Sequence, residues 1–65
     1  MAKYFVWRYD IFHPFRAYGT RNHIEPESDD LRCLWRGDSL KEARKVAKKA
    51  NKIQQGELKV EEGGN

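Results

Sequence analysis

Cysteine is nearly absent from this sequence, which has Cys33 as its single thiol among 65 residues. No intrachain disulfide can form. Cys33, His13 and His23 together are too few and too irregularly spaced to be the ligands of a structural zinc site. A chain of this length buries only about 60% of the surface that its unfolded form exposes. Stability must therefore come from packing within one small domain, or from packing shared with a partner or a second copy in a homodimer.

Long hydrophobic runs are also missing. No segment approaches the roughly 18 apolar residues that a membrane-spanning helix needs. The first ten residues, MAKYFVWRYD, are interrupted by Arg8 and Asp10, so they do not resemble a secretory signal peptide. We therefore expect no membrane partner, and the lone cysteine favours a reducing, cytoplasmic location.

Sequence patterns of catalytic sites are missing as well. There is no glycine-rich phosphate loop, no H-E-x-x-H and no G-x-S-x-G. The acidic run EPESDD (25–30) lacks the glycine and the spacing of a calcium loop. His13 precedes a proline, His23 lies in a polar run and Cys33 lies among core positions, so no pattern places an activating partner beside them. We predict a protein that is not an enzyme and that needs no metal or cofactor.

Charged residues are abundant but segregated along the chain, whose net charge is +3. The charge balance is +3 over residues 1–24, −3 over 25–38, +5 over 39–55 and −2 over 56–65. Alternating blocks of this kind predict a dipolar surface, which orients the approach of a charged partner.

The residue pattern predicts three strands before residue 37, the first and third from alternation and the second, less regular, from a polar and aromatic segment. These are residues 3–11, residues 15–24 with a bulge at Gly19, and residues 31–36, with a bend at His13 and the EPESDD loop between them. In the first and third strands we expect the odd positions to face the core. They are Phe5, Trp7, Tyr9, Leu31, Cys33 and Trp35.

The stretch SLKEARKVAKKANKIQQG (39–56) predicts one helix. Ser39 suits the N-cap and Glu42 completes a capping box, while Gly56 is expected to end the helix as its C′ residue. Residues 57–61 (ELKVE) permit a short fourth strand. At 100° per residue the apolar side chains form one stripe that would pack on the sheet. The stripe contains Leu40, Ala43, Val46, Ala47, Ala50 and Ile53.

The expected fold is a single α+β domain over residues 1–62 with a flexible tail over 63–65. A three-stranded antiparallel sheet would pack in two layers against the C-terminal helix, in the order β-β-β-α. This element order and the stretch WRGDSLKEARKVAKKA (35–50) resemble the arm-binding domains of phage-type integrases. The resemblance implies a sheet that lies in the major groove of DNA.

Positive charge gathers on the side of the helix opposite the apolar stripe, on Lys41, Arg44, Lys45, Lys48, Lys49 and Lys52. A solvated helix usually interleaves acids four residues from its lysines, whereas Glu42 is the only acid over residues 39–55 and lies four residues from none of them, and like charges repel at that spacing. A plain solvated face and a partner-facing surface are about equally supported. Because lysine acts as a point charge, the stripe predicts phosphate contacts without base-specific readout.

The even strand positions form a second candidate surface, expected on the side of the sheet away from the helix. Its members are Tyr4, Val6, Arg8, Arg32, Leu34 and Arg36. Guanidinium groups beside an aromatic ring are typical of nucleic-acid-binding surfaces. The same residues also suit a protein contact with an arginine rim, or plain exposed surface.

Two functions follow from these surfaces. The first is a small nucleic-acid-binding module, for DNA or RNA, that contacts phosphates through the helix cations and the sheet-face arginines. The alternative is a protein-binding regulator or inhibitor, of the phage or mobile-element type, that docks an acidic partner protein through the same basic faces. The sequence leaves both open.

Overall fold

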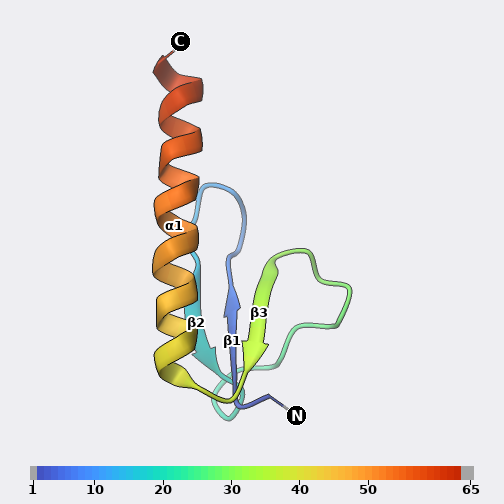
Figure 1. Cartoon of the computed structure of the whole chain (residues 1–65). Helices are drawn as coiled ribbons and strands as arrows, with labels where there is room; N and C mark the ends of the chain where they lie inside the picture. The colour runs from blue at the N-terminus through green and yellow to red at the C-terminus, as the bar shows by residue number, and fades with distance from the viewer. Residues whose placement is uncertain (1, 64–65) are drawn as a thin grey trace.

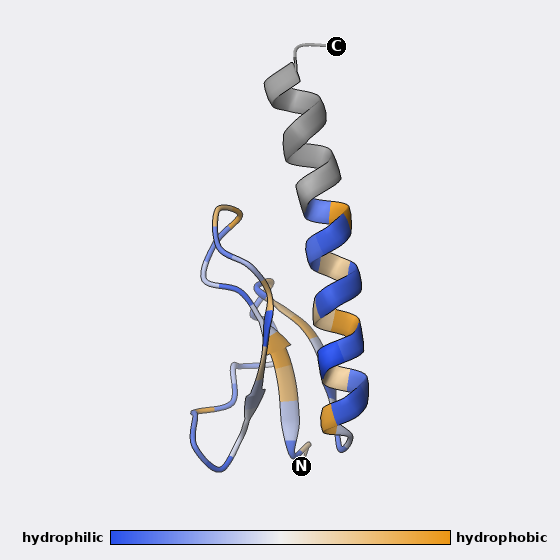
Figure 2. Cartoon of the chain, turned by 90° about the vertical axis from the view of Figure 1, so that its left-hand side faces the viewer, coloured by the Kyte–Doolittle hydropathy of each residue, from blue (hydrophilic) through white to orange (hydrophobic). Residues whose placement is uncertain are grey.

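The protein is a three-stranded sheet with one helix along its side, seen in a computed structural model that describes the backbone of residues 2–63 and the side chains of residues 2–54. The strands form an antiparallel sheet in the order β2-β1-β3, and α1 covers one face of it (Figure 1; Figure 2). The elements are β1 (Tyr4–Trp7), β2 (Arg16–Gly19), β3 (Cys33–Gly37) and α1 (Leu40–Gly63). The predicted α+β class and element order are confirmed.

Ser39 begins α1 as predicted. Its Oγ accepts the Glu42 N–H at 3.2 Å and its carbonyl accepts the Ala43 N–H at 3.0 Å. One of the N–H groups that a helix start leaves unpaired is thereby satisfied. The Lys3 N–H donates to the Asp38 carboxylate at 3.2 Å, which ties the turn before α1 to the start of β1.

The far end of α1 differs from the prediction. The helix continues through Gly56 to Gly63, so the predicted stop and the fourth strand over 57–61 are both wrong. A glycine inside a helix costs only about 1 kcal/mol relative to alanine, and the glutamate, leucine and lysine that follow it favour the helix. A helix also satisfies its backbone internally, whereas a lone strand needs a neighbour. A flexible tail was expected over residues 63–65. Its first residue, Gly63, is the last residue of α1, and residues 64–65 lie outside the described residues.

On β1, the helix covers the face opposite to the predicted one. Val6 is fully buried and packs with Ala43 and Ala47, with Tyr4 among the half-buried side chains around them. The prediction that Tyr4 and Val6 are exposed on an open face is therefore wrong. Leu31 and Tyr9, predicted to lie in the core, are 98% and 61% exposed.

Close packing explains this choice of face. Both faces of β1 are apolar, so alternation alone does not distinguish them. Ala43 and Ala47 let the helix approach the sheet closely, and Val6 fits the space between them. The larger Phe5 and Trp7 side chains pack on the other face, where both contact the Tyr18 ring.

A β-bulge in β3 separates two residues that the sequence places on one face. Trp35 pairs with Val6 but Cys33 pairs with Trp7, so Leu34 is the extra residue. Trp35 therefore packs toward α1 and Cys33 lies on the opposite face. The bulge predicted at Gly19 is wrong, because Gly19 pairs in register with β1 and ends β2.

Two amide side chains fasten α1 to the connection between β1 and β2. The Phe15 N–H donates to Asn51 Oδ1 at 2.6 Å, and Asn51 Nδ2 donates back to the Phe15 carbonyl at 3.0 Å. One turn later, Gln54 Nε2 donates to the Ile11 carbonyl at 2.8 Å. These bonds fix the helix beside the sheet and so determine which helix side faces solvent.

Candidate functional site

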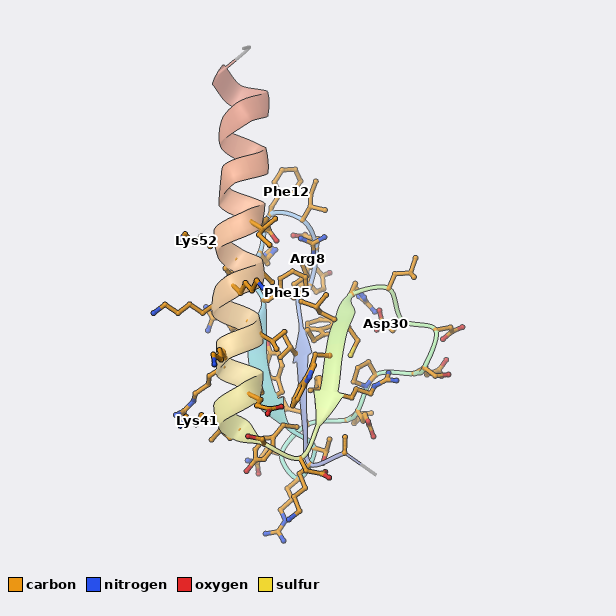
Figure 3. The ribbon with its side chains drawn as sticks, in the orientation of Figure 1. Arg8, Phe12, Phe15, Asp30, Lys41 and Lys52 are labelled. Atoms are coloured by element: carbon orange, nitrogen blue, oxygen red, sulfur yellow. The ribbon has the colours of Figure 1, made fainter. Side chains whose placement is uncertain are left out.

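The most strongly charged surface is the side of α1 that points away from the sheet. Figure 3 shows Lys41 and Lys52 projecting from this side, away from the strands. At about 1.5 Å per residue, the stretch between them is roughly 16 Å long. All six predicted helix cations are exposed, and we call them the basic stripe: Lys41, Arg44, Lys45, Lys48, Lys49 and Lys52.

The basic stripe carries its positive charge unneutralised by the described part of the chain. None of its members takes part in an ion pair among the residues whose side chains are described. The one acid among them, Glu42, lies in the first helical turn, where it interacts favourably with the helix dipole. Repulsion between lysines four residues apart would be relieved by a bound polyanion.

Arg8, predicted on an open sheet face, instead lies between the sheet and the helix. Its guanidinium donates to Gln54 Oε1 and stands 4.7 Å from the centroid of the Phe15 ring. Figure 3 shows Arg8 and Phe15 close together beside α1. Arg8 therefore helps to join α1 to the β1–β2 connection and does not extend the basic stripe.

Arg32 contacts Asp30 and Trp7 on the face of the sheet turned away from α1, which we call the far face. Its Nε stands 3.1 Å from Asp30 Oδ1, and its guanidinium carbon lies 5.0 Å from the Trp7 ring centroid. The Trp7 Nε1–H donates to Asp30 Oδ2 at 3.2 Å. Hydrogen bonds from Arg32 lower the pKa of Asp30 to about 2, and the bond to Asp30 raises the pKa of Arg32.

Arg36 anchors the acidic loop to β3. Its Nη2 donates to the carbonyls of Pro26 and Glu27, each at 2.6 Å, and its Nε lies 3.5 Å from Glu25 Oε1. The acidic loop is thus bonded to the sheet. Arg32 and Arg36 both contact their own chain, so neither is a free cation on the far face.

The anchored loop and the sheet border a far-face cleft of about 580 Å³. Its walls are aromatic: the Tyr18 ring stacks on Phe5 with centroids 5.3 Å apart, and Trp7 and His23 meet Tyr18 edge to face at 6.1 and 4.8 Å. Three carboxylates line it, and no lysine or arginine does among the described side chains. The carboxylates belong to Glu25, Glu27 and Asp30.

Sequence reasoning missed this cleft. It assigned Phe5 and Trp7 to the core beneath the helix and left Tyr18 without a role. The available signal was the acidic run 25–30 followed closely by Arg32 and Arg36, a spacing that allows the loop to fold back on the sheet.

A second groove, of about 510 Å³, runs between α1 and β3. Leu34 and Ile53 line it and are 51% and 55% exposed. Its charged members, Arg8 and Lys49, are both cationic. The groove joins the basic stripe at Lys49.

Metal-binding clusters and membrane-spanning helices are both absent from the described residues. No group of three or more histidine, cysteine, aspartate or glutamate side chains there is placed to hold a metal ion. No helix in the same part of the chain has the length and apolar character needed to cross a membrane.

No protein-family model, no curated protein and no solved structure matches this chain. The sheet that the integrase resemblance would place in a DNA groove is covered by α1 on one face and carries the anchored acidic loop on the other.

Proposed function

We propose that the protein is a small, non-enzymatic nucleic-acid-binding module that contacts phosphates through the basic stripe of α1. The observation that carries the proposal is the gathering of six exposed cations, with one acid among them, on one helix face. Each phosphate that a lysine neutralises releases a condensed counterion, which drives binding and makes it depend on salt. With five lysines to one arginine, the stripe suits backbone contacts more than base readout.

The contact surface in this proposal is narrower than the one that the sequence suggests. Tyr4 packs beside the core, and Arg8, Arg32 and Arg36 are bonded within the chain. The helix alone therefore supplies the contacts, and binding is expected to be nearly independent of nucleic-acid sequence. The protein would act in the cytoplasm and would need no cofactor.

The test is fluorescence anisotropy with a labelled generic DNA duplex, and with single-stranded DNA and RNA, across a salt series. We expect an affinity that falls log-linearly with salt. The triple variant Lys45→Glu, Lys48→Glu, Lys52→Glu should weaken binding by about tenfold or more and flatten the salt dependence. These side chains are exposed, so the fold should survive the change.

The matched control reverses three exposed cations outside the stripe, as Lys3→Glu, Arg16→Glu, Arg21→Glu. Each set of three reversals changes the net charge by six, from +3 to −3. If the control weakens binding as much as the stripe variant, overall charge and not the stripe is responsible. No binding at low salt by the unaltered protein would refute the proposal.

A second candidate is the docking of an acidic protein partner, which the groove between α1 and β3 favours. Leu34 and Ile53 offer apolar contact there, and Arg8 and Lys49 offer charge of the complementary sign. The charge-neutral variant Leu34→Gln, Ile53→Gln separates the two functions. It should leave duplex binding unchanged if the stripe is the functional surface.

A further inference from the structure

The far-face cleft has walls that attract positive charge. Aromatic rings carry negative potential on their faces, and a cation within about 6 Å of a ring centroid is held by it. One such contact already exists on this surface, since the Arg32 guanidinium carbon lies 5.0 Å from the Trp7 ring centroid. Tyr18 and His23 add further rings beside Trp7.

The rim of the cleft is acidic beyond what its own arginines neutralise. Three carboxylates line the cleft and two arginines pair with them, which leaves a net charge of −1. Glu25 and Asp30 are paired with Arg36 and Arg32. Glu27 lines the cleft and forms no ion pair within the described part of the chain.

The cleft is also held in shape before any ligand arrives. Arg36 fixes the backbone of Pro26 and Glu27, and Asp30 fixes the indole of Trp7. Walls that are already ordered lose little conformational freedom on binding, which favours even a small ligand.

The chemistry of the cleft selects among ligands. Phosphate-bearing ligands would be repelled by the acidic rim. Hard metal ions require several oxygen ligands, and no such cluster exists among the described residues. A neutral apolar ligand would use the rings but leave Glu27 without a role. An alkylated ammonium ion, which is apolar in surface and positive in charge, uses both.

We propose that the far-face cleft binds an organic ammonium ion such as choline, with its alkylated nitrogen against the aromatic wall that Trp7 and Tyr18 share and beside the carboxylate of Glu27. This site lies on the opposite face of the sheet from α1 and goes beyond nucleic-acid binding. It does not depend on the basic stripe.

The test is an NMR titration of the full chain with choline chloride at constant ionic strength. The indole N–H signal of Trp7 should shift with saturation, while that of Trp35, on the helix side, should not. The uncharged isostere 3,3-dimethyl-1-butanol has the same shape and should bind at least about threefold more weakly. Equal binding of the two compounds, or no saturable shift at Trp7, would overturn the proposal.

Matched variants locate the charge that is recognised. Glu27→Gln should weaken choline binding by about threefold, whereas Asp29→Asn, the same loss of charge in the same loop but outside the cleft, should not. Equal effects of the two variants would refute a role for Glu27. Acetylated trimethyllysine amide carries the same ammonium group on a peptide unit, and its competition with choline would support the same site with a polypeptide source.

Discussion

The Trp35 ring packs closely over Gly37. A Cβ atom built at this position would lie 2.4 Å from two ring carbons of Trp35, which is nearer than carbon atoms can approach. Trp35 is itself half-buried against the helix, so its rigid ring has little room to move. At Gly19 the nearest atom to such a Cβ, in the Tyr4 ring, is 3.8 Å away, an ordinary contact. The two strand glycines therefore differ in what they tolerate.

We expect Gly37→Ala to destabilise the protein by about 1–3 kcal/mol, because the added methyl displaces the Trp35 ring from the core. Gly19→Ala should change stability by less than about 0.5 kcal/mol, because the space is open. Urea unfolding followed by circular dichroism measures both. Similar losses in the two variants would contradict the role assigned to the Trp35 contact.

Asp30 should make stability depend on pH in acid. Hydrogen bonds from Arg32 lower its folded-state pKa to about 2, below the value of about 3.9 for an unfolded aspartate. The unfolded chain therefore takes up the proton first, and stability falls as the pH drops from about 4 to about 2. Asp30→Asn should make this fall shallower, as measured by urea unfolding at several pH values.

Some acid sensitivity should remain in Asp30→Asn, since a hydrogen bond from His13 lowers the pKa of Asp10 as well. Asp29→Asn is the control, because the Asp29 side chain makes no hydrogen bond or ion pair within the described region. If Asp29→Asn flattened the acid dependence as much as Asp30→Asn does, the Arg32 pair would not be its source.

At the level of elements, α1 organises the molecule. Its first turn is capped locally by Ser39. Its position on the sheet is fixed by Asn51 and Gln54, whose side chains bond to backbone groups more than 35 positions earlier in the chain. Its alanines bring it close to β1, and this leaves the basic stripe pointing outward. The helix thus serves as half of the core and as the proposed binding surface.

Continuation of α1 through Gly56 has a measurable consequence. Alanine has a higher helix propensity than glycine. Gly56→Ala should therefore stabilise the protein by up to about 1 kcal/mol and raise its helical circular dichroism signal. Gly63→Ala, at the last helical position, should have a smaller effect. Were Gly56 instead a left-handed C′ residue, alanine there would destabilise the protein and lower the signal.

On the scale of the whole molecule, opposite charges lie on opposite sides of the sheet. The basic stripe faces outward on α1, and the acidic loop borders the far-face cleft beyond the strands (Figure 3). A charged partner would be oriented by this separation before contact. Because α1 and the sheet stand between the two surfaces, a substitution that disables one surface leaves the other in place.

The features that the sequence alone determined are local. The capping serine, the helical period that places the cations on one side and the two-residue alternation of β1 depend on neighbours a few positions away. The basic stripe was therefore predictable residue by residue. The position of the helix end was not, since one glycine is too small a penalty to outweigh the helix formers after it.

Only the tertiary structure decided which face of the sheet meets the helix and which groups the arginines of the sheet bond to. Both faces of β1 are apolar, and the choice depended on how closely Ala43 and Ala47 approach Val6. Arg8 and Gln54 are 46 positions apart, and Trp7 and Asp30 are 23 apart, so no sequence pattern reveals these bonds. The far-face cleft exists because such long-range contacts, made only in the folded chain, outweigh local alternation.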